Sequence, residues 1–284
     1  MNLAPTGGDR NLIAIFDAHT IHDLKVNLRA RDGVVRLSSL TGTLHGGQLA
    51  MKANFNGKHN VAILATQGSL TDMDIATTLA ALEAEPLMTG STDLNWTLNA
   101  RGTTVNELIG ALNGPLTLEG KDAILKNLGV ERMLCEAVAL VNQQPLSASF
   151  PTDTAFQSLA VDVQLVQGEA RLRPLLAALP GVQLTGTGKL DLLSRDFDTT
   201  FEARLSPALA AVDPACRINE RYTAIDWPVT CAGNVAGEPD EWCKVDTAAI
   251  IEELASGELK RKAAEEVERK FGEEAGDLLE KLFQ

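Results

Sequence analysis

Regular alternation of apolar and polar residues is the feature that most restricts how this chain can fold. Three runs alternate over seven positions: Leu24–Ala30, Leu94–Ala100 and Leu159–Leu165. Because successive side chains of a strand point to opposite faces, each run predicts a strand with one apolar and one polar face. The chain is therefore expected to be mainly β, with a sheet that has one apolar side.

Tight turns separate these runs from the strands that follow them. Asp32-Gly33 lies between the first run and Val35–Leu37, and Asp-Gly is a strong hairpin signal. Gln167-Gly168 follows the third run in the same way and leads into Ala170–Leu172, so the later passage repeats the earlier one. Neighbouring strands are therefore expected to pair in an antiparallel meander.

A few helices interrupt the β pattern. The sequence predicts short helices near residues 72–83, 104–112 and 130–142, the second opened by a Thr104-x-x-Glu107 capping box. From residue 247 onward the chain has no proline, many charges, and apolar residues at helical spacing. We therefore divide the chain into a β region, 1–245, and a C-terminal helical segment, 246–284. That segment either docks on the sheet or detaches to meet a membrane or partner.

Charge and composition exclude several kinds of partner. The chain has 25 Lys and Arg against 38 Asp and Glu, a net charge of −13, and only 4% aromatic residues. Nucleic-acid binding depends on clustered cations and base-stacking rings, so no nucleic acid is expected. No apolar run approaches the ~20 residues of a membrane-spanning helix, and residues 1–10 do not resemble a signal peptide. Any membrane anchor is expected outside this sequence.

The four cysteines are Cys135, Cys216, Cys231 and Cys243. They form no C-x-x-C pair, and the four histidines lie far from them in the sequence, so we expect no metal site and no cofactor. An even number of cysteines favours disulfides in an oxidising compartment over buried thiols. The expected pairs are Cys216–Cys231 and, secondarily, Cys135–Cys243.

Known catalytic motifs are absent from the sequence. It contains neither G-x-S-x-G nor H-E-x-x-H, and the Gly186-Thr-Gly188-Lys189 stretch lacks the other residues of a phosphate loop. We therefore predict no enzymatic activity and name no catalytic residue.

The apolar strand faces are the remaining functional candidate. Such strands could form a sandwich, a barrel or a curved open sheet, and in an open sheet the apolar face would line a groove. An exposed apolar lining of that size normally has a partner, such as a lipid chain or another protein surface. The predicted lining residues are Leu24, Val26, Leu28, Leu159, Val161, Val163 and Leu165.

Several passages resemble the AsmA family in the order in which they occur. Thr103–Leu118 is similar to the family's "tv-x-e-l-l-x-x-l-n-G-x-l-x-l" passage, and Phe156–Gly168 resembles a strand pair that follows it. Val182–Leu192 and Trp227–Asp246 resemble the closing elements. The resemblance covers roughly residues 90–250, and by the strand pattern it could extend over 11–250. It departs from the family pattern at Leu128-Gly129-Val130, where Gly-Ile-Asp is usual, and in the four cysteines.

This resemblance implies both a fold and a function. The fold would be an extended, curved antiparallel β-groove like that of bridge-like lipid transfer proteins, with short helices and the C-terminal helical segment. The chain would be the periplasmic part of a Gram-negative protein anchored in the inner membrane by an N-terminal helix. Its groove would hold phospholipid acyl chains and carry phospholipid between the inner and outer membranes, supporting outer-membrane biogenesis.

A second hypothesis comes from a different class of function. The chain could be a non-enzymatic, β-rich interaction module that assists outer-membrane protein assembly, with an outer-membrane or periplasmic protein partner at its C-terminal end. Phospholipid that co-purifies with the protein would favour the groove over the module.

Overall fold

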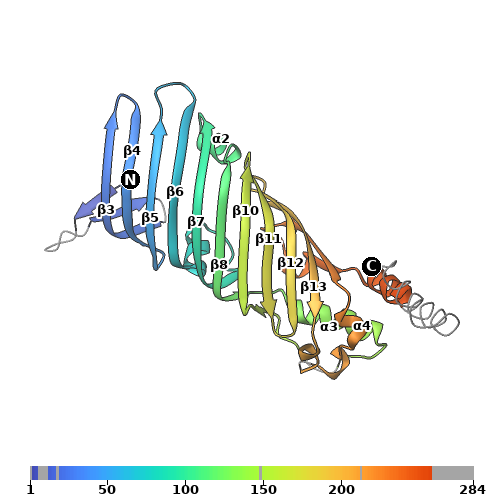
Figure 1. Cartoon of the computed structure of the whole chain (residues 1–284). Coiled ribbons are helices and arrows are strands. Elements are labelled where there is room, and N and C mark those ends of the chain that lie inside the picture. Colours follow the sequence, from blue (N-terminus) through green and yellow to red (C-terminus); the bar gives the residue numbers. More distant parts are fainter. Residues whose placement is uncertain (1, 6–11, 17–18, 147–148, 212, 258–284) are drawn as a thin grey trace, which may run out of the picture.

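A computed structural model describes residues 2–5, 12–16, 19–146, 149–211 and 213–257. In this part of the chain, fifteen strands form one antiparallel sheet in which sequential strands are neighbours, apart from the short β9, which pairs with β8. Figure 1 shows a long, open, curved sheet that runs from the N-terminal strands to the C-terminal ones. The prediction of a mainly β protein with an antiparallel meander and few helices is confirmed.

The strands are β1 (Asn2–Pro5), β2 (Leu12–Phe16), β3 (His19–Arg31), β4 (Val34–Leu44), β5 (Gly47–Asn56), β6 (Ala62–Asp74), β7 (Met88–Gly102), β8 (Gly114–Leu125), β9 (Thr154–Ala155), β10 (Ser158–Val166), β11 (Glu169–Leu179), β12 (Val182–Asp191), β13 (Asp196–Leu205), β14 (Trp227–Asn234) and β15 (Cys243–Val245). The helices are α1 (Ile75–Ala81), α2 (Val105–Gly110), α3 (Val130–Val141) and α4 (Glu220–Thr223), with 3-10 turns η1 (Pro207–Ala211), η2 (Pro214–Cys216) and η3 (Pro239–Glu241).

The two predicted turns have the backbone that tight hairpins need. Asp32 and Gly33 have φ values of 51° and 74°, and Gln167 and Gly168 have 51° and 76°. Two successive residues with positive φ match the right-handed twist of the flanking strands. The earlier and later hairpins therefore share one turn geometry, as the sequence repeat indicated.

Bulges interrupt the long strands at positions that the sequence pattern did not indicate. The pairing register shifts around Asp23 in β3, Asp72 in β6 and Asp122 in β8, and all three have φ between 49° and 55°. Aspartate tolerates this left-handed backbone better than most residues, so it suits the extra position of a bulge.

Capping side chains set where the short helices begin. α1 and α2 lie inside the ranges 72–83 and 104–112, and both begin after a capping residue. Asp74 accepts a 2.6 Å hydrogen bond from the Thr77 amide, and Thr104 accepts a 3.2 Å bond from the Glu107 amide. In the C-terminal segment, residues 247–257 are helical, and the rest of the predicted 246–284 lies outside the described residues.

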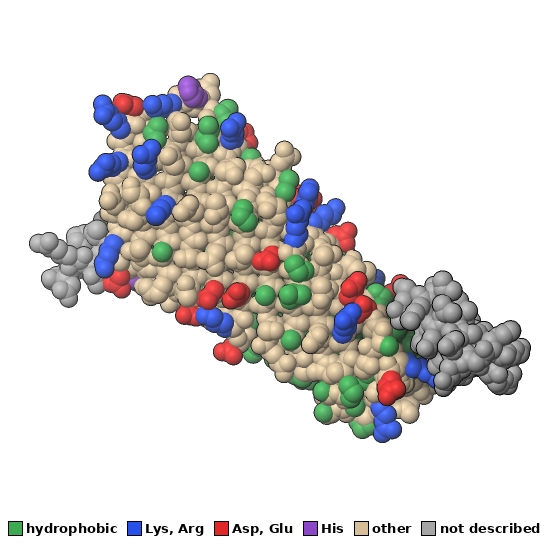
Figure 2. Space-filling model, in the orientation of Figure 1, with side chains coloured by type: hydrophobic (Ala, Val, Ile, Leu, Met, Phe, Trp, Pro, Cys, Tyr) green, Lys and Arg blue, Asp and Glu red, His purple; other side chains and the backbone are tan. Residues whose placement is uncertain are grey.

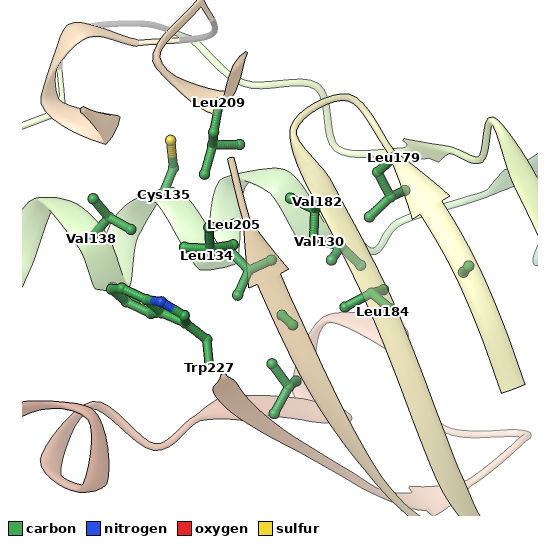
Figure 3. Close-up of a cluster of buried hydrophobic side chains, with 14 of the residues drawn as sticks. Val130, Leu134, Cys135, Val138, Leu179, Val182, Leu184, Leu205, Leu209 and Trp227 are labelled. Carbon is green, nitrogen blue, oxygen red and sulfur yellow. The ribbon is translucent and has the colours of Figure 1, made fainter. Parts of the chain in front are cut away.

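The hydrophobic core is concentrated in the C-terminal half. There α3 packs against the sheet and against the segment that contains η1 and η2. Figure 3 shows Leu134 and Val138 of α3 beside Leu205 and Trp227. Leu134, Val138 and Trp227 are fully buried, so this half of the sheet is covered on one face.

All four cysteines are paired, but the predicted pairs are wrong. The disulfides are Cys135–Cys216 and Cys231–Cys243. Cys231 and Cys243 are directly opposite each other in β14 and β15, which leaves Cys216 to reach Cys135 on α3. The prediction of at least one disulfide among Cys216, Cys231 and Cys243 holds, whereas Cys216–Cys231 and Cys135–Cys243 do not form.

Candidate functional site: the apolar face of the sheet

One row of directly opposed residues runs across the sheet from β3 to β15. Residues that face each other across neighbouring strands place their side chains on the same face. In order, the row is Val26, Leu40, Met51, Gly68, Trp96, Leu116, Val163, Leu172, Gly188, Thr199, Cys231 and Cys243. We call the side of the sheet that carries this row the apolar face.

The predicted lining residues lie on this face. Val26 and Val163 belong to the row, and alternation within β3 and β10 places the others on the same side. Leu24, Leu159 and Leu165 are buried, whereas Val26 and Leu28 are exposed. Contact of these residues with lipid stays a prediction.

The opposite side of the sheet is polar. The row beside the one above is Lys25, Thr41, Ala50, Ser69, Asn95, Thr117 and Asp162. Figure 2 shows a face of this kind, with charged side chains spread over it and hydrophobic ones scattered singly. We call it the polar face; solvent can cover it without a partner.

Over β3 to β5 the apolar face remains open. Val26, Leu28 and Phe55 are 42%, 52% and 37% exposed, which is high for large apolar residues on a sheet face. α1 and α2 contact β7 near opposite ends of that strand, and α3 lies further along the sheet. Contiguous exposed apolar surface usually marks a site that binds something.

Further along, the same face becomes the floor of a partly open apolar cavity of about 290 Å³. Val130 and Met133 of α3 cover it, and Leu118 and Val161 contribute from the sheet. Val161 is two residues from Val163 on the same strand face, so the cavity adjoins the row. The full lining is Met88, Leu118, Leu125, Leu128, Val130, Met133, Phe156, Leu159, Val161, Leu175, Ala177, Leu184, Phe201, Val229, Cys231 and Cys243.

Two larger but shallower hollows, about 580 and 430 Å³, lie over β4 to β8. Their lining includes Lys52, Gln67 and Thr97, which are opposed to one another on the polar face. The larger hollow is also lined by Leu40, Met51, Trp96 and Leu116 of the row, so its walls are both apolar and polar.

Several ionisable groups of the described residues form structural contacts. The Lys121 ammonium lies 2.6 Å from Asp72 and 3.0 Å from Asp93, and these hydrogen bonds raise the pKa of Lys121. Burial raises the pKa of Glu131 at the start of α3. In this part of the chain no three His, Cys, Asp or Glu side chains are arranged to hold a metal ion.

Sequence reasoning left out several residues of the apolar face. Trp96 and Leu98 come from the alternating run Leu94–Ala100, so the signal was present although neither was included in the lining. The Trp96 indole lies over Gly68 and donates a 3.2 Å hydrogen bond to the Thr66 hydroxyl. Phe156 and Met133 reach the cavity through tertiary packing, which no local pattern reveals.

None of the described helices is both long and apolar enough to span a membrane. The comparison with solved structures found no match. Among curated proteins, Protein AsmA of Escherichia coli (strain K12) is 22% identical over 184 residues, which are 64% of this chain and 30% of that protein. This chain thus matches less than a third of the length of that relative.

The AsmA family profile matches residues 14–175, more than half of the chain. This range contains the resembling passages at Thr103–Leu118 and Phe156–Gly168, whereas Val182–Leu192 and Trp227–Asp246 lie beyond it. It also contains the apolar face from β3 to β8, including the open stretch over β3 to β5. The chain belongs to the AsmA family.

Proposed function

We propose that the apolar face binds the acyl chains of phospholipids. The chain would be the periplasmic part of a protein that moves phospholipid between the inner and outer membranes and so supports outer-membrane biogenesis. In this proposal the protein acts as a β-groove without enzymatic chemistry, and an N-terminal helix outside this sequence anchors it in the inner membrane.

The observation that carries the proposal is the unbroken row from Val26 to Cys243. Neighbouring strands lie ~4.8 Å apart, so its course from β3 to β8 is ~24 Å long. One leaflet of a bilayer core is half of ~30 Å, so this stretch is longer than a single acyl chain. A continuous apolar strip of that length suits a flexible hydrocarbon chain that moves along it.

Two further observations support the proposed setting. Both disulfides suit an oxidising compartment such as the periplasm, because cytosolic thiols are kept reduced. The cavity beneath α3 adjoins the row and is lined by apolar residues, so it could receive the end of a chain.

Native mass spectrometry of the full chain, expressed in the periplasm, tests the proposal with a matched pair of variants. Leu98 and Thr97 are neighbours on β7, and they lie on the apolar and polar faces respectively. Leu98→Asp places a charge in the proposed lining and should abolish or strongly reduce bound phospholipid, whereas Thr97→Asp should retain it.

The outcome also distinguishes the two hypotheses for this chain. Bound phospholipid that depends on Leu98 supports the acyl-chain groove. Wild-type protein that carries no phospholipid after gentle extraction, and takes up none from added vesicles, contradicts it and favours the interaction module.

A further inference from the structure

We infer that the ends of β3 to β7 that lie beside α2 form a docking site for an anionic bilayer surface. This inference rests on the proposed function, for which it names the membrane contact and the point of lipid entry. The site comprises the hairpin between β3 and β4, the loop between β5 and β6, and the end of β7. We call it the basic rim.

The rim is one continuous edge of the molecule. The Gly57 amide donates a 2.8 Å hydrogen bond to the Gly33 carbonyl, which joins the β5–β6 loop to the β3–β4 turn. A Cβ atom placed on Gly33 would lie 3.3 Å from Cγ of Lys58, so the two tips touch. Figure 1 shows these tips and α2 at the same end of the strands.

Cations gather at this rim in a chain whose net charge is −13. Arg29 and Arg36 are directly opposed on the polar face, and like charges in that position destabilise a sheet unless an anion lies between them. Lys58 and Arg101 add two more, and none of these four has a carboxylate partner among the described residues. Figure 2 shows Lys and Arg side chains clustered over the ends of β3 to β5.

The carboxylates at the rim are few and engaged. Asp32 lies 3.2 Å from Arg31, and Glu107 accepts hydrogen bonds from the Thr103 amide and hydroxyl. The opposite ends of the strands are acidic instead. Their carboxylates are Asp23, Asp72, Asp74, Glu83, Glu85, Asp93 and Asp122, of which Asp72 and Asp93 are paired with Lys121. The sheet thus has a charge asymmetry along its strands that would orient it with the rim toward an anionic surface.

Large apolar side chains are exposed at the same rim. Val61, Ile63 and Val105 are 49%, 39% and 71% exposed, and the apolar-face residues Leu28 and Phe55 end there too. Cations interspersed with exposed apolar groups are typical of surfaces that bind anionic lipid headgroups and bury side chains at the acyl boundary. An acidic protein would satisfy the cations but not the exposed apolar groups.

The rim also lies where the apolar face begins. Phe55 is opposed to Val35 on one side and Leu64 on the other, and all three lie on the apolar face within two or three residues of the strand ends. A phospholipid that left a bilayer held at the rim could therefore pass its acyl chains onto the apolar face while its headgroup stayed near the cations.

Vesicle co-sedimentation of the full chain tests this inference. The vesicles contain either phosphatidylglycerol with phosphatidylethanolamine or phosphatidylcholine alone. The rim variant is Arg29→Gln, Arg36→Gln and Lys58→Gln, and the matched control is Arg173→Gln, Lys189→Gln and Lys244→Gln, which removes the same charge from exposed sites elsewhere. A second pair tests the apolar part: Val61→Ser with Val105→Ser, against Leu140→Ser with Leu176→Ser, which are also exposed.

We expect wild type to bind the anionic vesicles, to bind them less at high salt, and to ignore phosphatidylcholine. Loss of three rim cations should weaken vesicle binding on the order of 100-fold, and the charge control should bind as wild type does. The rim serine pair should weaken binding more than its control. Equal effects of rim and control variants, or equal binding to both vesicle types, would overturn the inference.

An apolar-face variant separates this inference from the proposed function. Leu94→Asp, on the same face of β7 as Leu98 but eight residues from the rim end at Gly102, should still dock on anionic vesicles although it no longer holds lipid. Wild-type protein that carries phospholipid but binds no vesicles would overturn the rim and leave the proposed function intact. Wild-type protein that docks on vesicles but never takes up lipid would contradict the proposed function and leave the basic rim intact.

Discussion

Cys135 on α3 is joined by a disulfide to Cys216 on η2, with Cα atoms 5.1 Å apart and a sequence separation of 81. Both residues are fully buried. The bond fastens α3, which covers the apolar cavity, to the segment with η1 and η2 that packs beside it. The cover over this part of the apolar face is therefore covalently held in place.

Removal of this disulfide should cost more stability than removal of the other one. On the chain-entropy account, closing an 81-residue separation contributes ~4.5 kcal/mol and a 12-residue separation ~2.8 kcal/mol. Urea unfolding should therefore show a larger loss for Cys135→Ala with Cys216→Ala than for Cys231→Ala with Cys243→Ala. The reverse order would contradict the assigned pairing or its role.

The helix at residues 247–257 should be docked rather than free. Ile250 is fully buried in the core and its neighbour Ile251 is 51% exposed, so the two form a matched pair. Ile250→Ala should lower the free energy of unfolding by about 2–5 kcal/mol, and Ile251→Ala should change it by less than about 0.5 kcal/mol. Equal, small effects in chemical denaturation would indicate a detached arm.

Gly68 should be needed for the position of Trp96. A Cβ atom at Gly68 would lie 2.5 Å from the Trp96 ring and 2.7 Å from the Ala50 carbonyl oxygen. Gly68→Ala should therefore displace the ring, change tryptophan fluorescence and destabilise the sheet by about 1–3 kcal/mol. Gly257→Ala meets no neighbour within 4 Å and serves as the control. Unchanged fluorescence in Gly68→Ala would show that the ring does not lie over this glycine.

Stability should fall in mild acid because of a histidine pair. His19 Nδ1 lies 2.8 Å from His45 Nε2. Partial burial lowers the pKa of His45, and the nearby His19 lowers it further. The carboxylate of Asp74 has the opposite, smaller effect and raises this pKa. The unfolded chain then binds a proton more readily than the folded one. This contribution to stability is present above the unfolded pKa of ~6.5 and is lost as pH falls toward the lower folded pKa.

His45→Asn tests this dependence, since asparagine tolerates the positive φ of 47° at this turn. Between about pH 7.5 and 5.5 the variant should lose less unfolding free energy than wild type. His59→Asn, in an exposed loop, should follow wild type. A pH slope in His45→Asn as steep as in wild type would contradict the assignment.

Local patterns predicted the faces of the sheet because alternation and turns are encoded by neighbouring residues. No bulge interrupts Leu94–Ala100, so Leu98 falls on the apolar face as its spacing indicates. The opposition of Arg29 and Arg36 also follows from the Asp32-Gly33 turn, since a two-residue turn fixes the register of both strands.

The disulfide pairing and the apolar cavity depend on tertiary packing, which no local sequence pattern indicates. β15 has three residues and no alternating pattern, so nothing local indicates that Cys243 lies opposite Cys231. When Cys231 pairs with Cys243, Cys216 and Cys135 remain. Cys135 can reach Cys216 only because α3 packs against η2. The cavity has the same origin, because Met133 and Phe156 meet the sheet from separate covering segments.

Photo-crosslinking to lipid tests the central claim most directly. A photoreactive amino acid would be placed singly at Trp96, Leu98 or Leu116 on the apolar face, and at Asn95, Thr97 or Thr117 on the polar face, in the full-length protein in cells. Mass spectrometry after irradiation would then detect phospholipid adducts. The account predicts adducts at the three apolar-face positions and none at the polar-face positions; adducts at neither set, or at both sets equally, would contradict it.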